Sequence, residues 1–445
     1  MGAVSGRSVL AVGAGLEQVP AIETARRLGL RVVAVDRDPG APGMVLADIA
    51  AAIDISDPEA VLAVAAAERV EAVLPAPIGR WLTTVGHVND RLGLRGVTAE
   101  AALACTDKQR FHERCLAAGA RRPPQAAAGG REQLLAAVEA VGLPCVLKPA
   151  AGSGSSAVVV VRSGAELDDA ADWHLARRPR GDHTLVEGLV TGQELGVDAA
   201  VVGGRLELVL LRAKELTPLP YRQQLNSTAP APLPARAIAA VGAELQTVVA
   251  ALGLTDCLVN ADVVLAPGDV ATVLEVAGRP AGARLADVVV PAVTGLAYLE
   301  LGMRMILGEP VDFRPSFLAA AVLRFFPFPA GRVVRVDPAP AAAASPDVLL
   351  FNCSLRPGQE LGPMTCVADG FERGLVVARG ADAAHARRLA DEVIAGLDVE
   401  IEISPRHRRT PSGTTRSDAA MSTHSIDADN RNAWTRILRA AGGPS

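Results

Sequence analysis

The segment LPCVLKPAAGSGSSAVVV, residues 143–160, is the most informative part of the chain. Its apolar residues 145–148 predict a buried strand that ends at Lys148, and the run 157–161 predicts the strand that follows. Such a lysine beside a small-residue loop indicates a phosphate contact, because the loop exposes backbone N–H groups and hydroxyls to an anion. The order of residues differs from a Walker loop, since here the lysine precedes the glycines. The loop consists of Gly152, Ser153, Gly154, Ser155 and Ser156.

The basic residues of the chain are strongly biased toward arginine. Only three of its 44 Lys and Arg residues are lysines: Lys108, Lys148 and Lys214. This chain uses arginine where a generic positive charge suffices, so a retained lysine suggests a site that needs a compact ammonium on a flexible stem. We therefore expect the three lysines to contact phosphate groups of one bound ligand. Thr106 and Gln109 resemble a capping pair that would place Lys108 in the first turn of a helix.

Two acidic residues lie within apolar strands further along the chain. Asp262 falls in the predicted strand 258–265 and Glu275 in the predicted strand 272–276, and the turn 266–269 joins the two. Across such a hairpin the carboxylates can face each other, and two neighbouring like charges usually hold a cation. Carboxylates together with phosphates are the ligands that Mg²⁺ prefers. Arg279, which follows in a Gly/Pro turn, can then meet a phosphoryl group or a carboxylate bidentately.

The N-terminal region predicts a βαβ unit with a parallel sheet. An apolar run at 8–12 is followed by Gly13 and Gly15, a helical stretch to residue 28 and a second apolar run ending at Asp36. This spacing resembles a dinucleotide fingerprint, but Gln18 stands where the third glycine belongs. We favour a scaffold beside a substrate cleft, with an NAD- or FAD-dependent dehydrogenase as an alternative.

Composition excludes several classes of function. The net charge of -5 and the lack of a clustered basic face before residue 404 argue against a nucleic-acid binder. No secretory signal and no run of about 18 apolar residues is recognisable, so we expect neither secretion nor a membrane span. The six cysteines are scattered, as in reduced cytoplasmic proteins, and the seven histidines form no pair with zinc-ligand spacing. We therefore expect a soluble cytoplasmic protein.

Taken together, these segments resemble the ATP-grasp superfamily of carboxylate-amine ligases over nearly the whole chain to residue 403. Within it, residues 355–403 are similar to the small C-terminal domain of L-amino-acid ligases, which form dipeptide-like amides. The resemblance rests on Thr106-Asp107-Lys108, on residues 143–149, on the small-residue loop, on Val186-Glu187 with Gly192-Gln193-Glu194, and on residues 275–282.

The resemblance implies roles for individual residues. ATP and Mg²⁺, or Mn²⁺ in its place, are the implied cofactors, and a substrate carboxylate would form an acyl phosphate that an amine captures. Arg279 would contact the reacting groups. The remaining implied contacts are Lys108, Lys148 and the loop Gly152 to Ser156 on phosphates, Lys214 beside them, Glu187, Leu189 and Val190 on adenine, Glu194 on ribose, and Asp262 and Glu275 on the metal.

The fold class implied is α/β and α+β multidomain. We expect a Rossmann-like N-terminal domain at 1–103 and an ATP-grasp small lobe with a glycine-rich flap at 104–184. A large lobe with the metal site would follow at 185–314, then a small C-terminal α+β domain at 315–403 with its own short strands. Residues 404–445 have the composition of a disordered tail.

Two departures from the family pattern leave alternatives open. Ala277 stands where many members have an asparagine that supplies a third metal ligand, so one or two metal ions remain open. Asn260 stands where relatives carry a basic residue or histidine, which shifts contacts to the acyl phosphate toward Arg279. The alternatives are a carboxylase or purine-pathway ligase acting on bicarbonate or formate, and a nucleotide-binding regulator. We expect substrate-lining loops at 75–81 and 216–230, small-molecule carboxylate and amine substrates, and compatibility with a homodimer.

Overall fold

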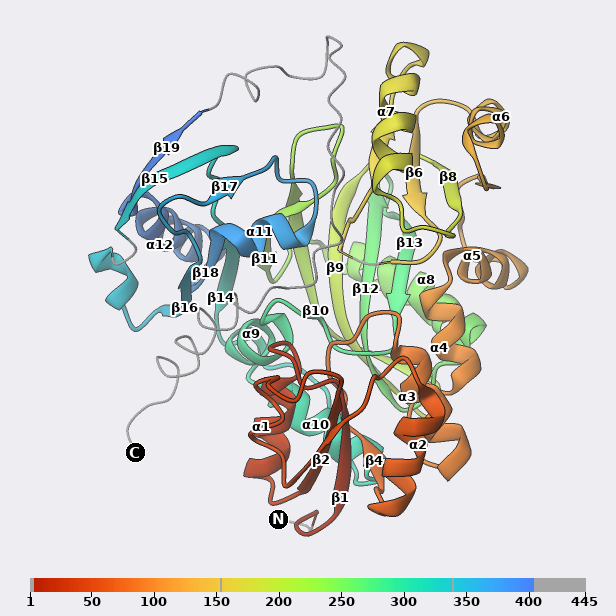
Figure 1. The fold of residues 1–445 in the computed structure, drawn as a ribbon, viewed down its shortest axis with the longest axis vertical. Coiled ribbons are helices and arrows are strands. Elements are labelled where there is room, and N and C mark those ends of the chain that lie inside the picture. The colour runs from red at the N-terminus through yellow and green to blue at the C-terminus, as the bar shows by residue number, and fades with distance from the viewer. Residues whose placement is uncertain (1–3, 153, 338–339, 404–445) are drawn as a thin grey trace.

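The computed structural model describes residues 4–152, 154–337 and 340–403. Figure 1 shows an N-terminal domain below, a small lobe at the upper right, and a large sheet that continues into the C-terminal region at the left. The predicted disordered tail at 404–445 and Ser153 of the small-residue loop lie outside the described residues.

The N-terminal domain is built around a parallel sheet of order β3-β2-β1-β4, which confirms the βαβ prediction. Asp36, at the end of β2, accepts a hydrogen bond at 2.8 Å from the backbone N–H of Ala14. The carboxylate therefore fixes the turn after β1, in which Gly13 has a φ of 84°. The elements are β1 Ser8–Val12, α1 Val19–Arg27, β2 Arg31–Asp36, β3 Ile49–Ala52, α2 Pro58–Ala67, β4 Ala72–Val73, α3 Leu82–Leu92 and α4 Ala99–Thr106.

The small lobe is an antiparallel sheet of order β5-β8-β6-β7 with three helices. The predicted strand–loop–strand at 145–161 is confirmed as β6 and β7. Because β8 pairs with β6 and β5, the division that we expected at residue 185 falls after Gly188 instead. The elements are α5 Lys108–Ala117, β5 Gln125–Ala128, α6 Arg131–Val141, β6 Cys145–Pro149, β7 Val159–Val161, α7 Gly164–Arg177 and β8 Thr184–Gly188.

The first turn of α5 holds Lys108 as predicted, but with a different cap. The side chain of Asp107 accepts hydrogen bonds from the backbone N–H groups of Gln109 at 3.0 Å and Arg110 at 3.1 Å. Thr106 is instead the last residue of α4, and its hydroxyl donates to the carbonyl of Ala102. A carboxylate is as good a cap as a hydroxyl, and here it lies one residue closer to the helix.

The large lobe contributes five strands to an eight-stranded sheet of order β13-β12-β9-β10-β11-β14-β18-β16. Residues of α8 pack in one core with β9 and β12, whereas α9 and α10 pack in a second core with β10 and β14. The elements are β9 Gln193–Val202, β10 Arg205–Leu216, β11 Gln224–Ala229, α8 Ala235–Leu252, β12 Cys257–Ala266, β13 Val270–Ala277, a π-helical turn Leu285–Val289, α9 Val290–Thr294 and α10 Tyr298–Ile306.

The C-terminal region does not form a separate set of strands, contrary to our expectation. β11, in a stretch expected to be a loop, pairs with β14, so that β14, β18 and β16 extend the large sheet. A three-stranded sheet β17-β15-β19 completes the region. The elements are β14 Ala320–Phe325, β15 Gly331–Asp337, a 3₁₀ turn Ala341–Ala344, β16 Val348–Cys353, β17 Glu360–Leu361, α11 Val367–Arg373, β18 Gly374–Gly380, α12 Ala383–Ala395 and β19 Asp398–Glu402.

One helix within the described ranges, α8, is long and apolar enough to cross a membrane by length and composition, and the bent pair at 285–306 passes the same test jointly. The buried side of α8 includes Val241, Leu245 and Val248, which pack in the core with strands of the large sheet. This packing is typical of a core helix.

Candidate functional site

The two predicted metal ligands lie opposite each other on neighbouring strands. Asp262 of β12 and Glu275 of β13 are direct partners in the antiparallel ladder, at a point where the register shifts by a bulge. The Lys214 ammonium, on β10, contacts Asp262 Oδ1 and is only 11% exposed. Among the described residues Glu275 forms no ion pair. One carboxylate is thus neutralised and the other is available.

This pair fits a divalent cation such as Mg²⁺. Two carboxylates that face each other supply hard oxygen ligands, and phosphates and water complete the shell of such ions. Within the described residues no group of three His, Cys, Asp or Glu side chains could hold a metal by itself. The roles of Asp262 and Glu275 as metal ligands stay predictions.

Lys148 lies in a buried cluster of charges. Its Nζ donates to Glu187 Oε1 at 2.8 Å, and Arg122 and Gln125 donate to Glu187 Oε2 at 3.2 and 3.0 Å. The side chains of Arg122, Glu187 and Lys148 are 1%, 5% and 12% exposed. Burial lowers the pKa of the Lys148 ammonium, although Glu187 opposes this shift. Burial raises the pKa of Glu187, but its two cationic partners outweigh that effect and lower it.

These contacts bear on the predicted role of Glu187. Its carboxylate was expected to face adenine, but both of its oxygens are already engaged by side chains of the small lobe. The backbone N–H of Leu189 donates to the carbonyl of Pro144 at 3.0 Å. Leu189 and Val190 are partly exposed, so an adenine contact by this hinge stays a prediction.

The small-residue loop is tied to α5 and to the large lobe. Lys108 Nζ donates to the carbonyl of Gly152 at 2.6 Å. The hydroxyl of Ser155 donates at 3.2 Å to the carbonyl of Arg222, in the turn between β10 and β11. Gly152, Gly154 and Ser155 have φ values of 133°, 68° and 59°, which favour glycine at the first two positions. Gly152, Gly154 and Ser156 are exposed, and the phosphate contact of this loop stays a prediction.

Glu194, predicted to contact ribose, faces a basic side chain. Its Oε1 contacts the Arg222 guanidinium, and the two side chains are 17% and 25% exposed. The predicted substrate loop at 216–230 is shorter than expected, because only residues 217–223 lie between β10 and β11. The ribose role of Glu194 stays a prediction.

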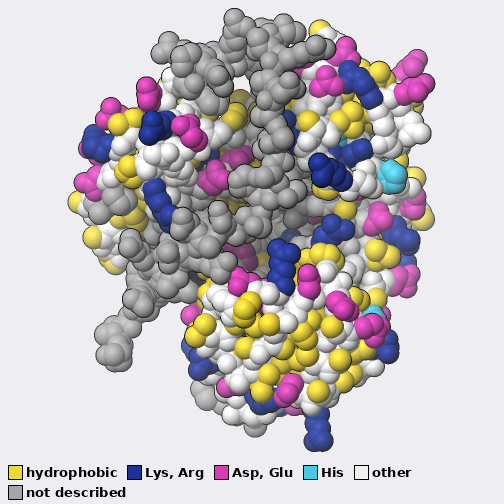
Figure 2. All heavy atoms as spheres, in the orientation of Figure 1, with side chains coloured by type: hydrophobic (Ala, Val, Ile, Leu, Met, Phe, Trp, Pro, Cys, Tyr) yellow, Lys and Arg dark blue, Asp and Glu magenta, His cyan; other side chains and the backbone are white. Residues whose placement is uncertain are grey.

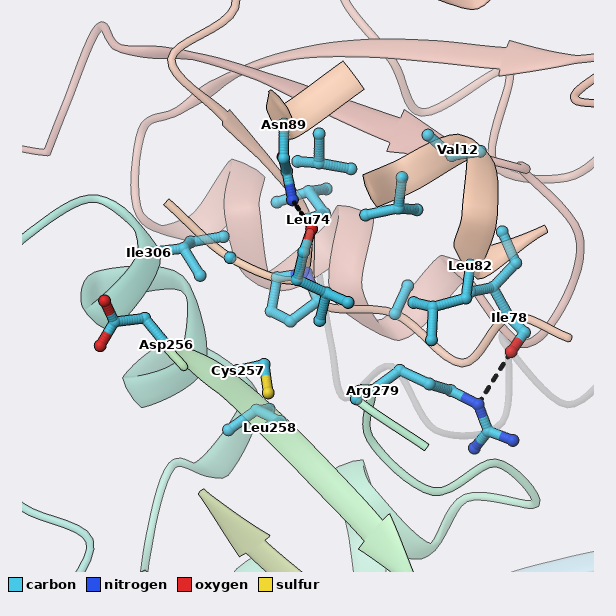
Figure 3. Close-up of a pocket in the computed structure, with 17 residues that line it drawn as sticks. Val12, Leu74, Ile78, Leu82, Asn89, Asp256, Cys257, Leu258, Arg279 and Ile306 are labelled. Atoms are coloured by element: carbon cyan, nitrogen blue, oxygen red, sulfur yellow. Dashed lines mark hydrogen bonds between the residues drawn. The ribbon is translucent and has the colours of Figure 1, made fainter. Parts of the chain in front are cut away.

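Arg279 lies where the N-terminal domain meets the large lobe. Its Nε donates to the carbonyl of Ile78 at 2.8 Å and Nη1 to that of Pro280 at 2.9 Å. Figure 3 shows its side chain beside a pocket that residues of the predicted loop 75–81 line together with the start of β12. Burial lowers the pKa of Arg279, and the carboxylates of Glu275 and Glu17 oppose that shift.

A second charged group beside Arg279 was not found from the sequence. Glu17, in the turn after β1, accepts a hydrogen bond at 2.9 Å from the backbone N–H of Ala283. Arg284 and Asp287 form an ion pair at 2.6 Å, and these residues line a second pocket with Glu17. Burial raises the pKa of Glu17 and of Asp287. Glu17 follows Gly15 in the stretch that we predicted to be helical, and no sequence pattern distinguishes its carboxylate.

The lysines and acidic residues come from the two facing lobes. In Figure 1, α5 and the small sheet lie beside the upper ends of β12 and β13. Figure 2 shows basic side chains next to acidic ones between the N-terminal domain and the small lobe on this face. Such an arrangement can neutralise a polyanion and orient a carboxylate beside it.

Two family models match separate parts of the chain. The ATP-grasp domain matches residues 141–287, which include β6, the small-residue loop and the Asp262/Glu275 hairpin. The L-amino acid ligase C-terminal domain 2 matches residues 324–402, from the end of β14 to β19.

Individual proteins are similar over different lengths. The formate-dependent phosphoribosylglycinamide formyltransferase of Burkholderia cenocepacia is 36% identical over 190 residues, which are 42% of this chain and 47% of that protein. The match thus spans about half the length of that relative. The structure of an L-amino acid ligase from Bacillus licheniformis superposes with a TM-score of 0.75 at 18% identity over 90% of this chain and 100% of that one. Phosphoribosylglycinamide synthetase from Anaerococcus prevotii gives 0.69 at 20% identity, over 89% and 100%.

Proposed function

This chain contains an ATP-grasp domain followed by the C-terminal domain of L-amino acid ligases, and on that premise we propose that it is an ATP- and Mg²⁺-dependent carboxylate-amine ligase. The enzyme joins an amino-acid carboxylate to an amine, forms a dipeptide-like amide and releases ADP and phosphate. The observation that carries this proposal is the ladder pair Asp262 and Glu275 beside Lys214, facing the lobe that holds Lys148 and Lys108. A cytoplasmic location and a homodimer remain predictions.

The residues divide the work between charge neutralisation and orientation. Lys148 and Lys108 hold the phosphates from the small lobe, and Lys214 does so from the large sheet. Asp262 and Glu275 would hold Mg²⁺, whose chemistry there would be to neutralise negative charge on the transferred phosphoryl group. Arg279, fixed by two carbonyl oxygens, presents its remaining N–H groups to the substrate carboxylate or the acyl phosphate.

The chemistry needs no protein nucleophile. The substrate carboxylate attacks the γ-phosphorus of ATP, the bond to ADP breaks, and an acyl phosphate forms. The amine then attacks the acyl carbon, phosphate leaves with one oxygen of the carboxylate, and the ammonium proton must pass to a base. Glu17 and Asp287 lie near Arg279, and their raised pKa values suit proton acceptance.

The same two carboxylates favour an ammonium-bearing substrate over a phosphorylated amine. Glu17 and Asp287 would repel a phosphate, and Arg284 beside them is already paired with Asp287. The second candidate function is that of a purine-pathway ligase acting on formate, which the 36% identity to the Burkholderia formyltransferase favours. The two functions differ in the acid that triggers ATP cleavage.

The proposal is tested by incubating the full chain with ATP, Mg²⁺ and pools of single amino acids, and with formate plus phosphoribosylglycinamide in a parallel arm. We expect ADP and phosphate to appear with particular amino acids, and hydroxylamine to trap the corresponding hydroxamate. Activity only with formate supports the second candidate. Release of AMP in place of ADP contradicts the acyl-phosphate mechanism.

A further inference from the structure

The side chain of Arg122 is only 1% exposed and lies near the proposed phosphate site, and the assigned chemistry does not use it. It lies between α5 and β5, and its guanidinium stacks on the Phe111 ring at 4.8 Å. One arm donates to Glu187 Oε2, and the other donates to the backbone carbonyl of Val273 on β13. The same carboxylate is therefore shared by Arg122 and Lys148.

The cluster carries one more positive charge than negative charge. Lys148 and Arg122 are cations, and Glu187 is the one carboxylate that both contact. Lys108 adds a further positive charge nearby and disfavours the Lys148 ammonium. Glu244 also attracts Arg122, and its negative charge offsets that of Lys108, so one positive charge remains in excess. His112 Nδ1 accepts a hydrogen bond from Arg122 Nε at 3.4 Å, and burial lowers the pKa of His112.

A buried group of charges with an excess of one sign is costly unless an ion of the opposite sign compensates it. An incoming phosphate supplies that ion, but to meet it the Lys148 ammonium must share or leave its partner Glu187. If Lys148 were the sole partner of Glu187, its departure would strand a buried carboxylate. With Arg122 in place, the carboxylate stays paired and hydrogen-bonded.

We propose that Arg122 is a positioning residue for ATP binding: it serves as the standing counter-ion of Glu187, and so frees the Lys148 ammonium for the phosphates. This inference rests on the proposed ATP binding and extends it to a residue that does not touch the nucleotide. The proposal predicts that the effect of removing Arg122 depends on whether Glu187 is charged. Removal of Arg122 locks Lys148 onto Glu187, and removal of the Glu187 charge releases Lys148 again.

The test measures the ATP dissociation constant of the full chain by titration calorimetry with Mg²⁺ at fixed ionic strength. We expect Arg122→Met to weaken ATP binding by on the order of tenfold, the scale on which buried charge pairs couple. In the double variant Arg122→Met/Glu187→Gln, affinity returns to within about threefold of wild type. Arg121→Met, the same change at the exposed neighbouring residue, serves as the matched control and leaves affinity unchanged.

The outcomes separate this role from a structural one. Unchanged affinity in Arg122→Met overturns the inference. The inference is also overturned if Arg122→Met loses affinity and the added Glu187→Gln change does not restore it. Arg122 would then act only through its hydrogen bond to the carbonyl of Val273. If Arg122→Met fails to fold, as judged by circular dichroism, Arg122→Lys replaces it: this variant keeps the charge and is expected to bind within about threefold of wild type, and a larger loss counts against us. Failure of the wild-type chain to bind ATP refutes the proposed function itself.

Discussion

Replacing Glu275 by Gln should separate the metal role of this residue from any role in stability. The carboxylate lies directly opposite Asp262 and forms no ion pair among the described residues, whereas Asp262 is held by Lys214. Like charges opposite each other on paired strands destabilise a sheet. Favourable cross-strand pairs contribute roughly 0.2–1 kcal/mol, and we expect the repulsion to be of similar size. Glu275 also attracts the buried Arg279, which offsets this repulsion, so without Mg²⁺ we expect Glu275→Gln to be about as stable as wild type.

Asp262→Asn, in contrast, is expected to lower the free energy of unfolding. This change removes the carboxylate that pairs with a Lys214 ammonium only 11% exposed, and should cost about 1 kcal/mol after allowance for the partial exposure of Asp262. Both variants should lose about 100-fold or more in kcat, the usual cost of removing one group that stabilises a transition state. They thus share a kinetic defect, but only Asp262→Asn is expected to lower the free energy of unfolding.

The assay is thermal and urea unfolding of wild type and both variants, without metal and then with Mg²⁺ and ATP. A ligand that binds only the folded state stabilises it by mass action, so wild type should gain stability with Mg²⁺ and ATP and Glu275→Gln should gain less. If Glu275→Gln retained full Mg²⁺-dependent turnover, or proved less stable than Asp262→Asn without metal, the assignment would be refuted.

Three further predictions concern the charged residues around the site. Arg279→Lys should lower kcat by about 100-fold in a steady-state assay. The ammonium of lysine cannot donate to both carbonyl oxygens and still offer two parallel N–H groups to the substrate. A near-normal kcat would contradict this role. Glu17→Gln should raise the KM for the amine. Because burial raises the pKa of Glu17, wild type should also lose stability relative to this variant as the pH rises above about 4.3, as measured by unfolding at a series of pH values. Parallel stability curves for the two proteins would contradict the raised pKa. Arg212→Met should destabilise the fold by about 3–5 kcal/mol in urea unfolding, because it leaves the fully buried Asp198 without its ion-pair partner. A loss below about 1 kcal/mol would contradict this role of the ion pair.

The local elements around the site were predictable from the sequence because they depend on short-range patterns. The strand ending at Lys148, the loop after it and the facing of Asp262 and Glu275 all follow from apolar runs of known period and a tight turn. The continuation of the large sheet into β14, β18 and β16 was not predictable, since strand pairing between β11 and β14 joins residues about 100 positions apart.

The sequence also did not predict which charged side chains contact one another. The bias toward arginine made the lysines conspicuous but hid Arg122 among the remaining basic residues. The predicted ligand contact of Glu187 stays a prediction, but its side-chain partners Lys148, Arg122 and Gln125 were not predicted. Residues that meet only through the fold, such as Glu17 and Ala283, leave no pattern within a sequence window.

The central claim is that a substrate carboxylate is activated by phosphoryl transfer from ATP. It is tested most directly by supplying an active amino acid with ¹⁸O at both carboxylate oxygens, together with ATP, Mg²⁺ and the amine. The released phosphate is then analysed by mass spectrometry. The account predicts one ¹⁸O atom in each phosphate, because a carboxylate oxygen leaves with the phosphoryl group. Phosphate without ¹⁸O, or label in AMP, would contradict it.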